Sequence, residues 1–488
     1  MFKSIRVGTG RASASFDVVL VESGASRLPR GLGLDHAKAF SAALETAGFK
    51  GGVGECVAVG AHGLIVGIGN RDDLTTDSAR TIGAAIVRRL DSADIRKATL
   101  HTQAVPARQL DARTLGEALG EGVGLGHWQY LEHVGSVSKR TVAASTLTLE
   151  SADADLRRGL KDGLVTADCV NETRRLAATP PNICHPKWMA SEARRLARAA
   201  GLTCKVINYE QAQKLGMGGI VNVGRGSAVK PCLIILEHKP AKVRKKTTVA
   251  LVGKTMTYDS GGYSLKIQGS MKGMKYDGNG GCAVLGAMLA IAARKLPVHT
   301  VGILPCAENM VSDDAYRPDD IITMYNGATV EVTNTDAEGR LILADALAYA
   351  CKQYRPTAII DAATLTGGIV VALGSWCAGL FANDDELVER VQGAADTTGE
   401  RVWRMPVWDE HRDFMRSKHA DLWNSGPKRD GHPIQGAAFL SFFVDDDVPW
   451  AHLDIAGTSA KDSDTGVTVP GPTGFGVRLL AEAVASYA

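Results

Sequence analysis

Four acidic side chains in the second half of this 488-residue chain stand at the ends of apolar, strand-like segments. Asp259 lies in TYDSGG, Asp277 in KYDGNGG, and Asp336 and Glu338 in NTDAEGRL. If the four converged, burial and like charge would oppose their ionisation, and two divalent cations would cancel the four charges. Carboxylate oxygens suit Mg²⁺, Mn²⁺ or Zn²⁺, and paired ions activate a water. The residues alone leave two alternatives, a two-metal site or separate caps and turns.

The segment VEVTNTDAEGRLIL, residues 330–343, begins like a strand and ends like a helix. Residues of the same parity share one face of an extended chain. Asp336, Glu338 and Arg340 are therefore predicted to point the same way if the strand persists to Arg340. Gly339 would then allow the turn into the helix.

Four continuous apolar runs predict the central strands of a sheet that is covered on both faces. They span residues 248–253, 300–307, 358–363 and 451–457, and polar residues follow each run. In open α/β sheets, ligands bind beyond the carboxyl ends of the strands. The chemistry is therefore expected in the second half of the chain.

The first half has the pattern of a smaller α/β domain without an evident cluster of titratable residues. Residues 18–23 and 63–69 are predicted strands, and residues 35–48 and 77–90 are predicted amphipathic helices. The run GEGVGLG, residues 120–126, has the wrong glycine spacing for a dinucleotide loop and is predicted to be a flexible turn.

A long helix is predicted over residues 154–178, and the breaker TPPN ends it. The predicted organisation is an N-terminal α/β domain over 1–150, an interdomain helix and linker over 151–180, and a catalytic domain over 181–488. The predicted fold class is α/β, and the C-terminal domain is expected to hold a central mixed, largely parallel sheet.

The composition is that of a globular protein, with 45% hydrophobic and 22% charged residues. A net charge of +2 gives no support for binding to nucleic acid or a membrane surface. Nine scattered cysteines without a CxxC pair argue against a disulfide framework and suit a reducing compartment. No apolar signal segment stands near the N-terminus, so a cytoplasmic location is expected. The basic run at 242–246 is predicted to be a hairpin turn.

Several blocks of the sequence together resemble the leucyl aminopeptidase family, the M17 metallopeptidases or cytosol aminopeptidases. NTDAEGRL resembles the family signature, and VGKTMTYDSGGYSLK, LPCAENMVSDDAYRPDDIITMYNG, ATLTGG and HLDIAG resemble further blocks in the same order. The resemblance covers roughly residues 165–488 closely, and the first 150 residues only in their pattern.

The resemblance implies a dinuclear-metal aminopeptidase that releases N-terminal residues from peptides. Its metal ligands would be Lys254, Asp259, Asp277, Asp336 and Glu338. Asp259 and Glu338 would bridge the ions, and Asp336 would serve the more exchangeable one. Lys254 would have to be a neutral amine, which burial and a nearby dication favour. The resemblance implies Mn²⁺ or Zn²⁺, with Mg²⁺ as a further candidate.

The family's catalytic groups fall on two further residues of this sequence. Lys266 would polarise the scissile carbonyl while a metal-bridging hydroxide attacks it. Arg340 would hold a bicarbonate ion as the proton shuttle. The substrate side chain would be surrounded by Met274, Thr364, Gly367, Ala456 and Ser459. Taken singly, Met274 could equally be core packing and Thr364 a strand-end hydrogen bond.

The chain departs from the family pattern at several positions without losing a ligand. The departures are Tyr258, Tyr263, Ile267, Gly278, Asn279 and Ser459. We expect the pocket changes to shift substrate preference, and we expect Gly278 to loosen the site of Asp277.

Two other classes of function are alternatives to the aminopeptidase. A two-metal phosphoesterase is disfavoured by the absence of histidine ligands and by the ligand lysine. A non-catalytic or DNA-binding member of the same family gains no support from the net charge. The expected partners are peptides with a free N-terminus and further copies of the chain in a homohexamer, with no membrane or nucleic acid.

Overall fold

The computed structural model describes residues 3–10, 16–29, 32, 34, 36–46, 48–102, 109–135, 137–138, 145–240 and 247–488. The basic run at 242–246, predicted to be a hairpin turn, lies outside these residues. The chain divides into two compact units, residues 1–171 with 462–470, and residues 172–461 with 471–488. The division falls within helix α4 (Ala154–Ala178). Residues 462–470 belong to the first unit, although the sequence analysis placed them in the C-terminal domain.

The first unit is built on a six-stranded sheet in the order β1-β6-β5-β2-β4-β3. Its neighbouring strands are parallel except for the hairpin of β3 and β4. The strands are β1 (Ser4–Gly8), β2 (Phe16–Val21), β3 (Cys56–Val59), β4 (Gly63–Gly67), β5 (Lys97–His101) and β6 (Thr146–Glu150). The helices are α1 (Ala37–Thr46), α2 (Thr76–Ser92) and α3 (Ala112–Gly126), with a 3-10 turn at Arg71–Asp73.

The prediction of a flexible turn at GEGVGLG is wrong, because these residues form the last turns of helix α3. A Cβ atom at Gly122 would lie 2.0 Å from the carbonyl oxygen of Arg80 on α2. One at Gly120 would lie 2.5 Å from the carbonyl oxygen of Leu160 on α4. The glycines therefore let three helices pack backbone against backbone, which compensates for their poor helix propensity.

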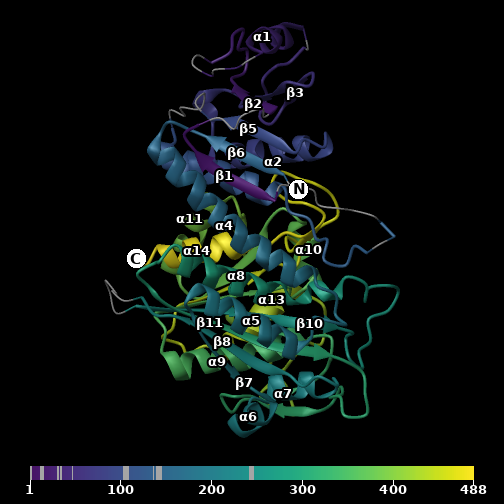
Figure 1. The fold of residues 1–488 in the computed structure, drawn as a ribbon. Coiled ribbons are helices and arrows are strands. Elements are labelled where there is room, and N and C mark those ends of the chain that lie inside the picture. Colours follow the sequence, from purple (N-terminus) through teal and green to yellow (C-terminus); the bar gives the residue numbers. More distant parts are fainter. Residues whose placement is uncertain are drawn as a thin grey trace. The chain divides into compact units, whose positions relative to one another are not determined.

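The second unit holds a nine-stranded sheet in the order β16-β15-β18-β14-β9-β11-β8-β7, and β10 pairs with β11. Strands β7, β8, β10 and β11 of this sheet are labelled in Figure 1. In the part of the chain that the structure describes, five of its strand pairings are parallel and three are antiparallel. The predicted mixed, largely parallel sheet is therefore confirmed. The strands are β7 (Thr203–Ile207), β8 (Cys232–His238), β9 (Thr248–Gly253), β10 (Thr255–Asp259), β11 (His299–Asn309), β14 (Ala358–Ala363), β15 (Ala378–Ala382), β16 (Val402–Arg404) and β18 (Trp450–Asp454). The four predicted central strands correspond to β9, β11, β14 and β18.

Helices α8 (Asn279–Ala293) and α9 (Glu338–Tyr354) cover opposite faces of this sheet. Val301 and Ile303 of β11 belong to one buried cluster with side chains of α9. Gly302 between them faces the other way, and a Cβ atom there would lie 2.7 Å from Met288 of α8. Both helices are therefore apolar along most of their surface, as expected for elements inside a layered α/β core.

The remaining elements of the second unit surround this core. The helices are α5 (Pro186–Ala200), α6 (Tyr209–Leu215), α7 (Gly218–Arg225), α10 (Gly367–Leu373), α11 (Asp385–Thr398), α12 (Asp409–Asp413), α13 (His432–Leu440) and α14 (Val477–Ala485), with 3-10 turns at Met274–Gly278 (η2) and Ser441–Phe443. Two small sheets comprise β12 (Ile321–Thr323), β13 (Thr329–Glu331) and β17 (Leu422–Trp423), and β19 (Ala460–Lys461) and β20 (Gly471–Pro472). Among the described residues, the structure has no helix with the length and apolar character needed to cross a membrane.

Candidate metal centre and active site

The carboxylates predicted from the sequence gather at the carboxyl ends of the central strands. Lys254 directly follows β9, and Asp259 is the last residue of β10. Asp277 lies in the 3-10 turn η2, and Glu338 is the first residue of α9. This is the edge at which open α/β sheets bind ligands. The topology therefore brings together side chains that are up to 84 positions apart in the sequence.

The backbone that positions Asp336 and Glu338 at this edge differs from the predicted continuous strand. Strand β13 ends at Glu331 and helix α9 begins at Glu338, so the strand does not persist to Arg340. The backbone N–H of Asp336 donates to the Asn334 side chain at 2.9 Å, which fixes the turn between them. The turn and the start of the helix, rather than strand parity, therefore aim the two carboxylates.

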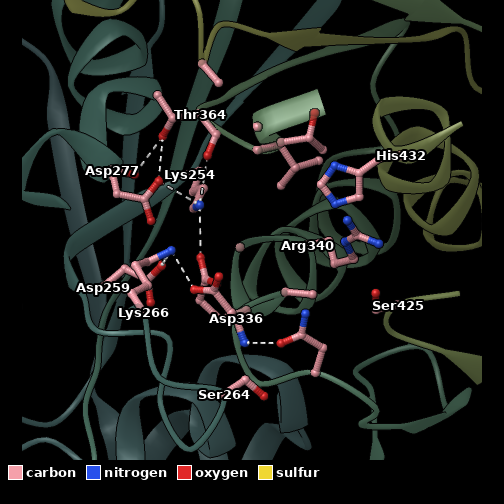
Figure 2. A pocket seen from close by; sticks show the side chains of 18 of the residues that line it. Lys254, Asp259, Ser264, Lys266, Asp277, Asp336, Arg340, Thr364, Ser425 and His432 are labelled. Atoms are coloured by element: carbon pink, nitrogen blue, oxygen red, sulfur yellow. Dashed lines mark hydrogen bonds and ion pairs between the residues drawn. The ribbon is translucent and has the colours of Figure 1, made fainter. Parts of the chain in front are cut away.

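Two lysines link the four carboxylates (Figure 2). The Nζ atom of Lys254 lies 2.8 Å from Asp277 Oδ1 and 2.9 Å from Glu338 Oε1, and it donates to the Thr364 carbonyl at 2.9 Å. The Nζ atom of Lys266 lies 2.9 Å from Asp259 Oδ2 and 2.5 Å from Asp336 Oδ1.

The carboxylates of this cluster are buried and close together, and both conditions shift the pKa values of its residues. Burial raises the pKa of Asp277 to about 7, although Lys254 opposes this effect. Burial, together with Glu338 and Asp259, raises the pKa of Asp336 to about 6. Burial lowers the pKa of Lys254, but the facing carboxylates outweigh it and hold that pKa above the ordinary value. Added divalent charge would favour ionised carboxylates and a neutral Lys254 amine.

The donor set fits divalent metal ions. One carboxylate oxygen from each of Asp259, Asp336 and Glu338 lies within 4.8 Å of the others. The second oxygen of Asp277, Oδ2, is buried and accepts no hydrogen bond from the described residues. A buried carboxylate oxygen without a partner is costly unless a cation or donor meets it. These oxygens together form a hard ligand set of the kind that Mg²⁺, Mn²⁺ and Zn²⁺ accept.

Neighbouring groups orient the carboxylates, and the sequence analysis missed one of them. Asp259 Oδ1 accepts hydrogen bonds from the Gly261 N–H at 2.9 Å and from Asn309 Nδ2 at 2.8 Å. Asn309 is fully buried at the end of β11, two residues after the strand predicted over 300–307, so its position was an available signal. Such supporting contacts fix the orientation of metal ligands.

Asp277 is held firmly despite the glycine that follows it. Its Oδ1 accepts a hydrogen bond from Thr364 Oγ1 at 2.8 Å. A Cβ atom at Gly278 would come within 3.0 Å of the Met256 carbonyl oxygen. Close packing therefore explains Gly278, and the expected loosening finds no support in these contacts.

The cluster forms one wall of a cavity of about 740 Å³. Every predicted site residue lines it, including Lys266, Arg340 and the five residues predicted around the substrate side chain. Of the departures from the family pattern, only Ser459 lines the cavity, and Asn279 donates to its carbonyl oxygen at 3.4 Å. Tyr263 and Ile267 are exposed instead, at 47% and 66%.

Arg340 lies in the first turn of α9 and is buried. Its Nη1 donates to the Asn424 carbonyl at 2.7 Å, while its Nε has no partner among the described residues. Burial lowers its pKa to about 10, against the opposing effect of Glu338 and Asp454. Arg340 therefore remains a cation at neutral pH, with a free donor.

A basic loop, which was not predicted from the sequence, also lines the cavity. Lys428, Arg429 and His432 all face this space, and His432 lies near Arg340 in Figure 2. The charge of this segment, PKRDGH, was a visible signal. No apolar strand precedes this segment, so the pattern of polar residues at strand ends does not include it.

The fold and the site define a class, namely α/β proteins with a carboxylate cluster suited to divalent cations at the carboxyl edge of the sheet. Residues 171–481 match the catalytic domain of the cytosol aminopeptidase family, and residues 18–133 match that family's N-terminal domain. A probable cytosol aminopeptidase of Roseiflexus castenholzii is 42% identical over 431 residues, 87% of each chain. One of Aquifex aeolicus is 39% identical over 445 residues, 90% of this chain and 88% of the relative.

A solved structure is similar over nearly the whole length. The bottromycin maturation enzyme BotP in complex with Mn superposes with a TM-score of 0.86 at 34% identity, covering 97% of this chain and 99% of that one. The chain therefore belongs to the cytosol aminopeptidase family, the M17 peptidases. This family is one of metal-dependent peptide hydrolases.

Proposed function

We propose that the protein is a dinuclear-metal aminopeptidase that removes the N-terminal residue from peptides. The observation that carries the proposal is the convergence of four carboxylates and two lysines on one cavity, with a buried Asp277 oxygen that accepts no hydrogen bond from the residues that the structure describes. Membership of the family supports the same reaction class. No observation in the site favours the phosphoesterase or the DNA-binding alternative.

The proposed metal ligands are Lys254, Asp259, Asp277, Asp336 and Glu338. Divalent ions in such a centre polarise a carbonyl oxygen and lower the pKa of a bound water. We propose Mn²⁺ or Zn²⁺, with Mg²⁺ as a further candidate; the similar BotP structure contains Mn.

Lys266 and Arg340 supply the proposed catalytic groups of the chain itself. The Lys266 side chain is 16% exposed, so its ammonium can turn from Asp336 toward a substrate carbonyl and donate a hydrogen bond to it. Arg340 keeps its charge and a free Nε donor, which suits the proposed bicarbonate ion. An anion held there would accept and return a proton during bond cleavage.

The wall of the cavity explains why a free N-terminus would be required. A substrate amine in its neutral form would sit against the carboxylate cluster, and its side chain would lie among Met274, Thr364, Gly367, Ala456 and Ser459. A peptide that continued in the N-terminal direction would have to pass through this closed cluster.

We also propose peptide substrates, a cytoplasmic location and the homohexamer implied by the resemblance. Analytical ultracentrifugation would test the homohexamer.

A panel of aminoacyl-p-nitroanilides tests the function. The protein is stripped with a chelator, assayed, and assayed again after addition of Mn²⁺, Zn²⁺ or Mg²⁺. We expect no hydrolysis without metal and restored hydrolysis of part of the panel with at least one ion. Failure of every anilide with every ion would refute the proposed activity.

A further inference from the structure

The basic loop beside the metal cluster carries charges that the proposed reaction does not use. Lys428 and Arg429 line the cavity, are exposed, and form no ion pair within the part of the chain that the structure describes. The acidic residues that line the cavity are the four carboxylates of the metal cluster. Asp430, the acidic neighbour of Arg429, does not line it. The cavity therefore has one wall of carboxylates and another with unpaired cations.

One buried side chain holds this loop in shape. Gln435 is 3% exposed, accepts a hydrogen bond from the Gly426 N–H at 3.1 Å, and donates to the Lys428 and Asp430 carbonyls at 2.7 Å each. The loop also packs tightly against helix α10, because a Cβ atom at Gly368 would lie 2.9 Å from His432 Nδ1. Its backbone is thus fixed before any ligand arrives, which lowers the entropic cost of binding.

The basic residues on this side of the cavity form a deep pair, Arg340 of α9 and His432 of the loop, and an outer pair. Arg340 and His432 lie deep, and burial lowers the pKa of His432, with Arg340 and Arg429 adding to the effect. The lowered pKa favours the neutral imidazole of His432, so Arg340 is the charged member of the deep pair. Lys428 and Arg429 are exposed and charged, so they form the outer pair at the opening.

The geometry of the proposed reaction decides which part of a substrate meets the outer pair. The amine faces the carboxylates and the first side chain faces the wall of Thr364 and Ser459. Figure 2 shows Ser425, Arg340 and His432 on the opposite side from Asp259 and Asp277. The loop wall is therefore left for the residue that follows the scissile bond.

We propose that Lys428 and Arg429 form a subsite for a carboxylate on the leaving-group side of the scissile bond. Two sources share this chemistry, the terminal carboxylate of a dipeptide and an acidic side chain at the second position. This inference rests on the proposed aminopeptidase function, and it adds the class of peptide that the enzyme prefers.

Two pairs of peptides test the subsite and separate the two sources. Both pairs begin with the residue that the anilide panel ranks first, written Xaa. In the first pair, kcat/KM is compared for Xaa-Gly and its C-terminal amide. In the second, it is compared for Xaa-Glu amide and Xaa-Gln amide. We expect the carboxylate member of at least one pair to be preferred about fivefold, since two exposed cations act on one anion. Added salt should weaken that preference.

The variants Lys428→Gln, Arg429→Gln and the double variant connect the preference to the loop. The double variant should bring the ratio of the two kcat/KM values to about one. A double control, Lys214→Gln with Lys418→Gln, removes the same charge from exposed lysines outside the cavity and should keep the ratio.

The outcomes distinguish the subsite from the activity. Equal hydrolysis of both members of both pairs by the native protein would overturn the subsite and leave the aminopeptidase standing. An unchanged ratio in the double variant would do the same. If no peptide or anilide is hydrolysed with any ion, the proposed function fails, and the subsite fails with it.

Discussion

Gly339 is the second residue of helix α9, and the side chain of Lys254 passes directly over it. A Cβ atom there would lie 2.4 Å from Lys254 Cε and 2.7 Å from both Cδ and Nζ. Carbon atoms in contact prefer separations of about 3.5–4.0 Å, so Gly339→Ala must push the lysine by roughly 1 Å. Lys254 is buried and held by three contacts, so it cannot move aside without losing some of them.

The expected size of the effect follows from two opposing terms. In a helix without neighbours, Gly→Ala stabilises by about 1 kcal/mol. Overpacking a filled core costs about 1–3 kcal/mol, so we expect Gly339→Ala to be destabilising or at best neutral. A displacement of about 1 Å in an active site can lower kcat/KM by about 100-fold. The functional loss should therefore be far larger than the loss of stability.

The assay compares Gly339→Ala with Gly393→Ala by anilide hydrolysis and thermal unfolding of the metal-free protein. Gly393 lies exposed on helix α11, and a Cβ atom there would meet nothing within 4 Å. The control should raise the unfolding temperature and keep full activity. Native activity and unchanged metal content in Gly339→Ala would refute the view that this glycine exists to admit Lys254.

Three further predictions address the ligands, their protonation and the first unit. Glu338→Ala should lose bound metal, measured by plasma mass spectrometry, and lose activity while its circular dichroism stays native; retained activity would contradict its role as a ligand. In the folded, metal-free protein the pKa values of Asp277 and Asp336 are about 7 and about 6, above the ordinary value of 3.8. The folded state therefore binds more protons than the unfolded state between about pH 4 and 7, and the contribution of these groups to the free energy of unfolding falls as pH rises through that range. Metal binding should then release protons from these two carboxylates below pH 7, and from the Lys254 ammonium both below and above pH 7, so affinity should rise with pH and rise less steeply above pH 7. Calorimetry at pH 6 in two buffers should detect the release. Gly122→Ala should destabilise the first unit by about 1–3 kcal/mol, because its Cβ atom would collide with the Arg80 carbonyl; unfolding at the native temperature would argue against that packing.

The sequence by itself determined the central strands and the identity of the reactive residues. Runs such as TVALVG are apolar on both faces, which suits strands covered by helices on both sides, and β9 begins and ends where that run does. The motifs around Asp259 and Asp336 indicated the family, because ordered blocks of residues are a local property of the chain.

Only the tertiary structure decided how these residues meet. The direction of Glu338 depends on a turn and a helix start, which strand parity could not predict. GEGVGLG became a helix, since the close approach of α2 and α4 outweighs the low helix propensity of glycine. The buried Gln435 side chain forms hydrogen bonds with the backbone of the loop, and this places Lys428 and Arg429 at the cavity. Contacts between residues distant in the sequence are set by packing, and a local pattern carries no information about them.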